Sequence, residues 1–597
     1  MKTTKLFLTL LMFACCITKA QLTYTPVTNG LNTITFEGAN SEVEVGDVDN
    51  DGDLDFVSIG DHGCPLVNAT EEGIMVWKNN GYGTAWNETQ TGSFGYGGCA
   101  LGDVNNDGKM DIGYSMHHNY STNDFGDQLM EVALGNGTGN SWTPYDDGLA
   151  TNGESWGMFG TDFADVNNDG LLDIGANSFG CCSGIHVYKN NGGGTWTQTW
   201  GVNGGNGRNE FMFGDFDNDG NTDIATANEW GLIWRNNGAG QFSAMINGFI
   251  PADTVPNYGY VNLAVGDVNN DGAKDVAVID IFSDSVRVFT YNKSQSKWLS
   301  ISNGLPVNAN YGGVVWNIAL ADMDMDGKSD VILFENDSIV IYKGDGSGNW
   351  TRAGKINTAE SSYGAVNTGD FDHDGFTDIV YIGSSSIGGQ NYLRVYLHVV
   401  SNPTLAILSN YPQGNECFQP NSVQFIKWTS SVPVGPPANV TIDFSSSGNG
   451  GPWTNVATNI PNSGAYQWTT PAISSPNCYL RFTISNGTSV QTVMTSAAFG
   501  IGACSTSSAV GDLKDELSAG ISIYPNPVSD EATISINNFK GEKAEINLYN
   551  AIGDKVLARE IKSSAIILLM SDYVSGVYFC ELKMENSIIR KKIVVAK

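Results

Sequence analysis

The chain has 597 residues, which is too long for a single hydrophobic core, so several domains are expected. Its 63 acidic against 30 basic residues give a formal net charge of −33, which argues against nucleic acid and, by charge alone, against anionic lipid as a partner. The 41% of hydrophobic and 11% of aromatic residues are too many for a wholly disordered acidic chain.

Residues 1–20 have the pattern of a secretory signal peptide. Two lysines precede an apolar run over residues 6–17, and Ala20 ends a small-x-small cleavage site. The run is too short to cross a bilayer as a helix, and no later stretch reaches 18 apolar residues. We therefore expect an exported protein without a transmembrane segment.

An acidic nine-residue pattern, D-x-[DN]-x-D-G-x-x-D, follows seven times. The copies begin at intervals of 48 to 62 residues, at Asp47, Asp103, Asp165, Asp215, Asp267, Asp322 and Asp370. Near-regular spacing of this size indicates an array of one supersecondary unit.

The pattern has the chemistry of a calcium loop. Side-chain oxygens at positions 1, 3, 5 and 9 and the backbone carbonyl at position 7 can surround Ca²⁺, and Gly at position 6 permits the sharp reversal. Solvated Asp-Asn-Gly turns are the alternative for any single copy, but seven copies favour calcium. An EF-hand is excluded because Glu is absent at position 12 and the flanks alternate like strands.

We expect about seven Ca²⁺ ions, one in each loop. Binding should be weaker in loops 2, 3 and 5, where Asn replaces Asp at position 3 and removes one charge. The candidate ligands, five in each loop, are Asp47, Asp49, Asp51, Asp53, Asp55; Asp103, Asn105, Asp107, Lys109, Asp111; Asp165, Asn167, Asp169, Leu171, Asp173; Asp215, Asp217, Asp219, Asn221, Asp223; Asp267, Asn269, Asp271, Ala273, Asp275; Asp322, Asp324, Asp326, Lys328, Asp330; and Asp370, Asp372, Asp374, Phe376, Asp378.

The flanks of each loop predict four antiparallel strands per repeat, which is the blade of a β-propeller. In the fifth copy "NLAVGD" precedes the loop, "KDVAVID" follows it, and a Trp-centred strand "KWLSISNG" ends the unit. The seventh copy lacks the fourth strand, and residues 21–31 resemble the missing one. We therefore predict an all-β chain with a seven-bladed propeller over residues 21–400, closed by its own N-terminal strand.

These repeats resemble FG-GAP or VCBS repeats, the calcium-loop propeller units of integrin α-subunits and of many secreted bacterial proteins. The resemblance covers residues 21–400. It implies that the calcium loops lie on one face of the propeller and that ligands meet the opposite face.

Residues 401–503 predict a β-sandwich. Alternating strands such as "VQFIKWTSS" and "CYLRFTISNG" are separated by turn residues, and Trp428, Trp453 and Trp468 are expected to pack in its core or at its edges. The segment resembles immunoglobulin-like modules of bacterial surface proteins.

A linker over residues 504–519 leads to a module over residues 520–597 with the pieces "ISIYPNPVSD", "INLYNAIGDKV", "VSGVYFCEL" and "IIRKKIVVAK". They resemble the C-terminal sorting domain of type IX secretion substrates of Bacteroidota. The resemblance implies the type IX machinery as partner, outer-membrane passage, and release or surface attachment. An ordinary small β-sandwich is the alternative.

Cysteines and histidines offer two further hypotheses. Eight cysteines follow the predicted cleavage site, and the pairs Cys64–Cys99 and Cys417–Cys478 could form disulfides in an exported protein, although sequence does not fix the connectivity. His62, His117 and His118 fall on loops of the non-calcium face, where they could bind a transition metal or act as acid and base, or could simply be exposed.

Aromatic, glycine-rich segments lead into the first strand of most blades, opposite the calcium loops. They could line one surface for sugar rings or peptide side chains, or could pack between blades. The candidate ligand-binding residues are Phe94, Tyr96, Trp156, Phe211, Tyr258, Tyr260, Tyr311, Trp316 and Tyr363.

Two classes of function remain open. The first is a calcium-binding adhesion or ligand-binding propeller for a glycan or a protein. The second is a polysaccharide lyase or hydrolase on a propeller scaffold, for which Glu210 and Asp61 could join a carboxylate pair. The sequence contains no nucleophile elbow, metalloprotease helix or phosphate loop, and the repeats explain most acidic residues, so binding is favoured.

Overall fold

The computed structural model describes residues 22–31, 42–59, 73–89, 97–116, 127–154, 157–178, 184–202, 207–228, 233–245, 247, 260–280, 285–307, 317–335, 338–358, 363–384, 391–398, 400, 403–435, 437–503, 521–524, 528, 531–536, 544–550, 555–561, 565–570, 573–574, 576–584 and 588–595. Every named element in these ranges is a β-strand, which confirms the predicted all-β class. No helix within them is long and apolar enough to cross a membrane. The chain forms two compact units, Met1–Thr506 and Ser507–Lys597.

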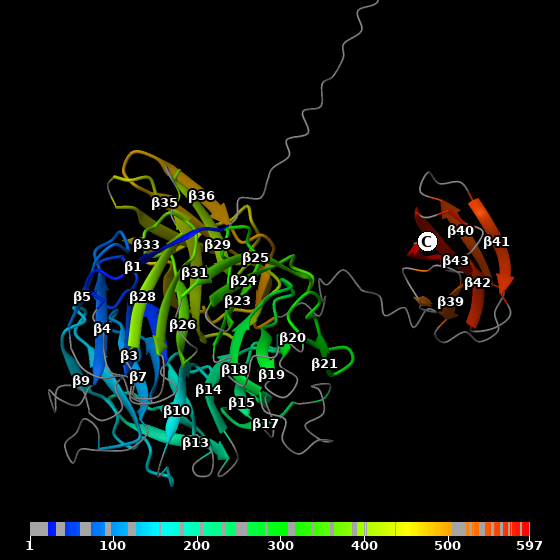
Figure 1. Ribbon diagram of the computed structural model, residues 1–597. Coiled ribbons are helices and arrows are strands. Elements are labelled where there is room, and N and C mark those ends of the chain that lie inside the picture. The colour runs from blue at the N-terminus through cyan, green and yellow to red at the C-terminus, as the bar shows by residue number, and fades with distance from the viewer. Residues whose placement is uncertain are drawn as a thin grey trace, which may run out of the picture. The chain divides into compact units, whose positions relative to one another are not determined.

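Seven four-stranded antiparallel sheets form the blades of the first unit (Figure 1). Blade 1 is β2 (Val43–Gly46), β3 (Asp55–Ile59), β4 (Ile74–Asn79) and β5 (Trp86–Glu88). Blade 2 is β6 (Gly97–Gly102), β7 (Asp111–Met116), β8 (Met130–Gly135) and β9 (Trp142–Pro144). Blade 3 is β10 (Met158–Ala164), β11 (Asp173–Ser178), β12 (Ile185–Asn190) and β13 (Trp196–Val202). Blade 4 is β14 (Gly207–Gly214), β15 (Asp223–Asn228), β16 (Ile233–Asn236) and β17 (Phe242–Ala244).

The remaining blades repeat this order, with one exception. Blade 5 is β18 (Tyr260–Gly266), β19 (Asp275–Asp280), β20 (Ser285–Asn292) and β21 (Lys297–Ser300). Blade 6 is β22 (Ile318–Ala321), β23 (Asp330–Glu335), β24 (Ser338–Gly344) and β25 (Trp350–Asn357). Blade 7 is β26 (Tyr363–Gly369), β27 (Asp378–Ser384) and β28 (Asn391–His398), and its fourth strand is the N-terminal β1 (Tyr24–Val27).

The first strands of the blades form a closed ring. β2, β6, β10, β14, β18, β22 and β26 contact one another in turn, and β26 returns to β2. β1 pairs with β28 from Tyr24↔His398 to Val27↔Val395, so the predicted closure by the N-terminal segment is confirmed. Closure covers an edge of β28 that would otherwise be free to pair with another chain.

The core of the propeller is divided into seven clusters, one between each pair of neighbouring blades. The second strands are buried on both faces, which explains their continuous apolar runs. Each fourth strand of blades 1 to 6 contributes one buried aromatic residue, and the Trp196, Trp298 and Trp350 indoles donate to backbone carbonyls of the preceding blade. The predicted Trp-centred strands therefore wedge the blades together.

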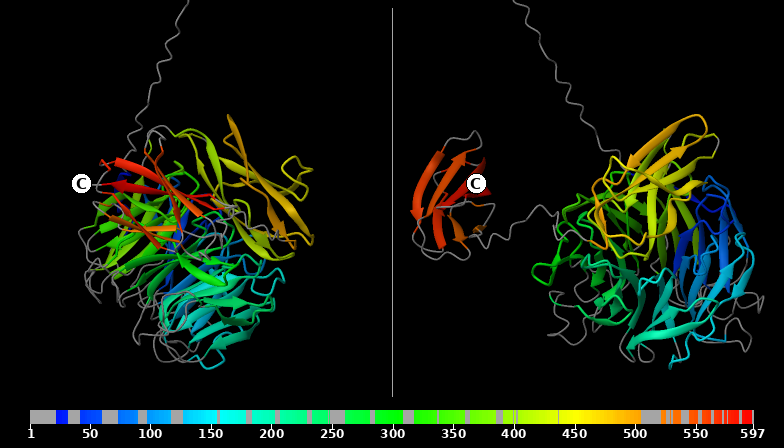
Figure 2. Two further views of the ribbon diagram at one scale, coloured as in Figure 1. Left: turned by 90° about the vertical axis from the view of Figure 1, so that its right-hand side faces the viewer. Right: turned by 180° about the vertical axis from the view of Figure 1, so that it is seen from behind.

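Residues 403–503 form a two-sheet β-sandwich, which lies against one face of the ring within the same unit (Figure 2). One sheet contains β29 (Ala406–Tyr411), β31 (Val423–Ser431) and β34 (Ala465–Thr469). The other contains β30 (Cys417–Phe418), β37 (Phe499–Ile501), β35 (Ser475–Ser485), β32 (Asn439–Ser445), β33 (Thr454–Pro461) and β36 (Val490–Met494). Trp428 and Trp468 are buried in its core, whereas the Trp453 ring lies 4.5 Å from the Arg481 guanidinium.

The second unit is a small sandwich of its own. β38 (Ile521–Tyr524), β39 (Glu531–Ile536) and β42 (Ala565–Leu569) form one sheet, and β41 (Lys555–Ile561), β40 (Ala544–Asn550), β43 (Gly576–Met584) and β44 (Ile588–Val595) form the other. Alternate residues of these strands, among them Ile534, Leu548 and Leu582, make its core.

Both hypothetical disulfides are wrong. Cys99 and Cys478 are free and buried, and Cys417 is disulfide-bonded, but not to Cys478. The Cys99 side chain lies in the core between blades 1 and 2, where its Sγ is 3.8 Å from the carbonyl oxygens of Glu42 and Val57.

Candidate metal centres and their cover

The seven acidic loops share one hydrogen-bond pattern, and each connects the first and second strands of a blade. In every loop the position-1 carboxylate accepts the N–H of the position-6 glycine, over 2.7 to 3.1 Å. The position-5 carboxylate accepts the N–H of position 7 in every loop. The side chains therefore curl the backbone around one point, as the calcium-loop interpretation requires.

Two residues of each loop have left-handed backbone conformations. The position-6 glycines have φ between 77° and 98°, as predicted from the pattern. The position-4 residues have φ between 53° and 60°, which sequence analysis did not anticipate. Asn fills position 4 in five loops because it tolerates this conformation better than most residues, whereas Met325 and His373 fill it in loops 6 and 7.

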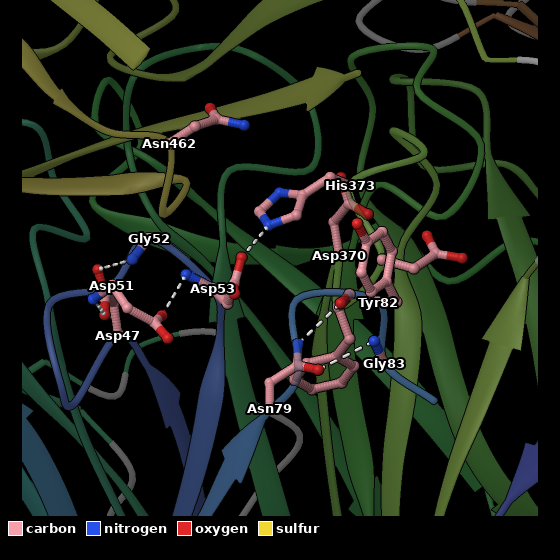
Figure 3. Close-up of polar contacts among 12 residues, drawn as sticks. Asp47, Asp51, Gly52, Asp53, Asn79, Tyr82, Gly83, Asp370, His373 and Asn462 are labelled. Carbon is pink, nitrogen blue, oxygen red and sulfur yellow. Dashed lines mark hydrogen bonds and ion pairs between the residues drawn. The ribbon is translucent and has the colours of Figure 1, made fainter. Parts of the chain in front are cut away.

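In loops 2, 3 and 7 the side chain at position 4 reaches the next loop of the ring. The Asn106 amide donates to Gly170 O over 3.2 Å, and the Asn168 amide to the Asn221 side chain over 3.2 Å. His373 Nε2 lies 2.9 Å from Asp53 Oδ1, which joins loop 7 to loop 1 (Figure 3). In loops 2, 3 and 7, position 4 thus links neighbouring blades.

The position-9 aspartates fasten each loop to its blade. One oxygen accepts the N–H of position 2 in all seven loops, over 2.9 to 3.2 Å. In six loops the other oxygen accepts the N–H of the last residue of the third strand, over 2.7 to 2.9 Å. The predicted position-9 ligand therefore has a structural task that the sequence pattern did not reveal.

The position-3 carboxylates provide the test of whether a cation fits. Oδ2 of Asp49, Asp217 and Asp324 is paired with Lys78, Arg235 and Lys343, respectively, from the third strand. Oδ1 of the same three residues is buried without a partner, as is Asp370 Oδ1 in loop 7. A buried, unpartnered carboxylate oxygen is costly unless a cation meets it, so the residues fit a hard divalent ion.

Groups of three carboxylates occur in loops 1, 4, 6 and 7, with one oxygen from each within 4.8 Å of the others. They are Asp47, Asp49, Asp55; Asp215, Asp217, Asp223; Asp322, Asp324, Asp330; and Asp370, Asp372, Asp374. These are the four loops with Asp at position 3. Burial, followed by neighbouring carboxylates, raises the pKa of Asp47 to about 7 and of Asp372 to about 7, so charge in these loops is unfavourable until a cation offsets it.

The sandwich covers the loop face and bonds to several loops directly. Gln467 exchanges two hydrogen bonds with the Asp103 backbone of loop 2, over 3.0 and 2.8 Å. The Val423 N–H donates to Asp165 Oδ2 of loop 3 over 3.1 Å. The Val432 N–H donates to His373 O of loop 7 over 2.8 Å.

The segment that precedes β30 forms hydrogen bonds with loops 4, 5 and 6. The Asn415 carbonyl accepts from the Asn218 amide over 2.8 Å, and the Asn415 amide donates to Asn270 O over 3.2 Å. The Gln413 amide donates to Gly327 O over 3.2 Å. Loop 1 is met by packing, since a methyl group built on Gly52 would lie 3.0 Å from Pro461, and Asn462 lies near this loop in Figure 3.

A cavity of about 670 Å³ lies between the first strands of the blades and the sandwich. Glu42, Glu44, Asp162 and Glu210 from the propeller and Lys427 from the sandwich are among its lining residues. Glu42 Oε2 accepts the N–H groups of Cys99 and Thr161, so it also serves the open inner edges of blades 2 and 3. Burial raises the pKa of Glu210 to about 7.

The candidate ligand-binding aromatics are only partly described. Phe211 is 2% exposed and packs edge-on against Phe213, so this residue is part of the core. Tyr260 and Tyr363 begin β18 and β26, and their backbones alone are described. Phe94, Tyr96, Trp156, Tyr258, Tyr311 and Trp316 lie outside the described residues, as do Asp61, His62, His117, His118 and the predicted signal peptide.

Comparison with known families agrees with this architecture. The FG-GAP-like repeat model matches residues 47–114, 215–278, 267–333 and 322–381. The secretion system C-terminal sorting domain model matches residues 522–596. The chain therefore contains FG-GAP-like repeats, which are arranged in a β-propeller fold. It ends in a type IX sorting domain, which indicates export by that secretion system.

No curated protein matches the chain. Among solved structures, a lectin of Agrocybe aegerita that recognises non-reducing terminal N-acetylglucosamine matches at 19% identity and a TM-score of 0.39, over 60% of this chain and 85% of that one. An ancestral GH74 enzyme matches at 12% identity and 0.37, over 95% and 78%. PorZ, a surface component of the type IX secretion system of Porphyromonas gingivalis, matches at 12% identity and 0.25, over 93% and 75%. Likeness at this level does not indicate a shared activity.

Proposed function

We propose that this chain is a calcium-stabilised ligand-binding protein, exported by type IX secretion, that recognises a glycan or a protein outside the cell. Calcium would be held by the seven loops and would neutralise the carboxylates at positions 1, 3, 5 and 9. The observation that carries this proposal is the set of buried, unpartnered Oδ1 atoms of Asp49, Asp217 and Asp324, each left free while a basic side chain holds the other oxygen.

The ligand surface is assigned to the face opposite the loops. The sandwich contacts the loops of all seven blades, so the loop face is already covered. The aromatic residues that the sequence predicts before the first strands are proposed to line that face, because aromatic rings beside polar groups suit sugar rings and peptide side chains.

A glycan array probed with the full chain in the presence of calcium tests the ligand surface. We expect binding that Trp156→Ala and Tyr258→Ala each reduce at least tenfold. Trp453→Ala is the control, because this tryptophan lies on the sandwich beside Arg481. An array without hits, together with no capture of a matrix protein from a defined panel, contradicts the binding proposal.

A polysaccharide-degrading enzyme is the second candidate, and the acidic cavity favours it. Glu210 accepts a hydrogen bond from the Asn262 amide over 3.2 Å, and its pKa of about 7 is in the range that suits a general acid at neutral pH. Glu42 is the second carboxyl group, and burial, followed by the nearby charge of Glu210, raises its pKa. Two buried carboxyl groups with raised pKa values can divide the roles of proton donor and base.

This candidate is tested by incubating the chain with a panel of polysaccharides and measuring released oligosaccharides. If it is right, Glu210→Gln abolishes release while Asp443→Asn, which alters a partly buried ion pair with Arg481 in the sandwich, leaves release unchanged. No release from any polysaccharide by the unmodified chain leaves binding as the function.

A further inference from the structure

The outer surface of the seven loops is unequally covered. A methyl group built on the position-6 glycine would meet the sandwich within 4 Å in six loops, whereas Gly108 of loop 2 has nothing within that distance. The tightest case is Gly272 of loop 5, whose added methyl group would lie 2.4 Å from Asn415 O. The six covered loops and the sandwich therefore have complementary surfaces.

Polar contacts of the sandwich reach the loop backbone itself. Asp165 is a position-1 residue, and its Oδ2 accepts both the Gly170 N–H of its own loop over 2.9 Å and the Val423 N–H of the sandwich over 3.1 Å. Asn218 and Asn270 are position-4 residues, and both bond to Asn415. The sandwich thus recognises the loops in their curled conformation.

We infer that calcium binding and docking of the sandwich are coupled: the sandwich is a cap that docks only on filled loops and in turn retards release of their calcium. This inference rests on the proposed calcium binding. It assigns Asn415, Gln467 and the Val423 N–H as positioning groups for the metal centres.

The physical reason is the charge in the loops. Without a cation, the carboxylates of each loop repel one another and burial disfavours their charged form, so the curled conformation that the cap recognises loses stability. A group that prefers the filled loop must raise calcium affinity by the same factor by which calcium strengthens docking. Couplings of this kind change affinity about 5- to 150-fold.

The first experiment compares Gly272→Ala with Gly108→Ala in the full chain. The two glycines occupy the same loop position with φ of 92° and 81°, so the backbone strain of alanine is similar. Only the Gly272 substitution drives a methyl group into the cap. We expect calcium release, measured by a chelating dye after rapid mixing, to accelerate about tenfold more in Gly272→Ala than in Gly108→Ala.

A second pair avoids glycine positions. Gln467→Ala removes two hydrogen bonds to Asp103, and Gln491→Ala removes an exposed glutamine of β36, which pairs with Ile484 of β35 inside the sandwich. Amide hydrogen exchange of residues 413–432 should rise on chelation, and should rise in Gln467→Ala even with calcium present. Residues 475–485 of β35, inside the sandwich, should stay protected, which distinguishes undocking from unfolding.

The outcomes separate the inference from the function on which it rests. Absence of calcium in the purified chain by elemental analysis, after dialysis against calcium, overturns both. If calcium is bound but is released from Gly272→Ala and Gln467→Ala at the same rates as from their controls, the coupling alone is overturned. The coupling is also overturned if amide hydrogen exchange of residues 413–432 does not change when calcium is chelated.

Discussion

Position 4 of the acidic loops explains a feature of the sequence that a ligand pattern alone leaves out. A ligand pattern needs oxygens at positions 1, 3, 5 and 9 and glycine at position 6, and all of these were predictable from sequence. Calcium ligation does not require Asn at position 4, and its recurrence there is explained only by the left-handed φ of these residues. Their recurrence in five of seven copies was the available signal, because Asn is the residue after glycine that most often adopts this conformation.

Met325 is the exception that allows a test. It has φ of 57°, where a side chain without a local polar partner costs about 1 kcal/mol relative to Asn. We expect Met325→Asn to raise the melting temperature of the first unit and Asn168→Met to lower it. Scanning calorimetry with saturating calcium measures both. A lower melting temperature for Met325→Asn would mean that the contact of Met325 with loop 7 outweighs the backbone strain.

Glu154 gives a prediction about pH. Its buried side chain lies 2.7 Å from His186 Nδ1 and accepts from the Tyr188 hydroxyl. Burial alone would raise the pKa of Glu154, but the hydrogen bonds from His186 and Tyr188 outweigh it and lower the pKa to about 2. Because the folded pKa lies below the ordinary value, the charged form stabilises blade 3 above about pH 4.5, and this stabilisation is lost as the pH falls toward 2.

Glu154→Gln removes that contribution and keeps the shape of the side chain. We expect the wild type to be more stable than the variant by about 3 kcal/mol at pH 6, with the difference shrinking below pH 4.5. Urea unfolding of both proteins across this range measures it, and protonation of the calcium loops affects both proteins alike. A difference that is constant with pH contradicts the assignment.

At the scale of elements, strand pairing was readable from sequence and the disulfides were not. Four alternating segments per repeat and the orphan N-terminal segment determined the blades and their closure, since antiparallel strands joined by short turns pair with their neighbours. The position of a cysteine on a face of a strand depends on register within a blade. Cys99 faces the core between blades 1 and 2, so sequence proximity to a loop was a poor guide to its partner.

One residue of the N-terminal segment allows a test of how much ring closure contributes to stability. Leu31 follows β1, is buried between blades 7 and 1, and packs with residues of both. We expect Leu31→Ala to destabilise the first unit by about 2–3 kcal/mol, while Thr25→Ala on the exposed side of β1 changes stability little. Denaturant unfolding compares the two. Equal effects would mean that the segment contributes backbone pairing only.

At the scale of the whole molecule, the two compact units should respond differently to a chelator. All seven loops belong to the first unit, and the described strands of the second contain no such loop. A ligand that binds only the folded state stabilises it by about 2.7 kcal/mol per site at a hundredfold excess over Kd. We therefore expect calorimetry to show two transitions, of which a chelator lowers only that of the first unit. A shift of both, or of neither, contradicts the proposed calcium sites.

The arrangement of the sandwich on the propeller was outside the reach of sequence. Its strands and its buried tryptophans were predicted, but docking depends on shape matching between turns far apart in the chain, such as Gly272 against Asn415. No periodicity records such a contact. The family resemblance indicated which face binds ligands and gave no information on what would occupy the other.

The propeller has seven similar blades, whereas the sandwich that covers its loop face has no such symmetry. The sandwich can therefore dock in only one orientation. The loops therefore have different surroundings: a methyl group built on Gly108 would have nothing within 4 Å, whereas one built on Gly272 would meet the Asn415 backbone and the Asn218 side chain. Copies that look interchangeable in the printed sequence are not so in the folded chain. Exchanging the second and fifth repeats would preserve every blade, but the sandwich would lose the loop surface on which it docks.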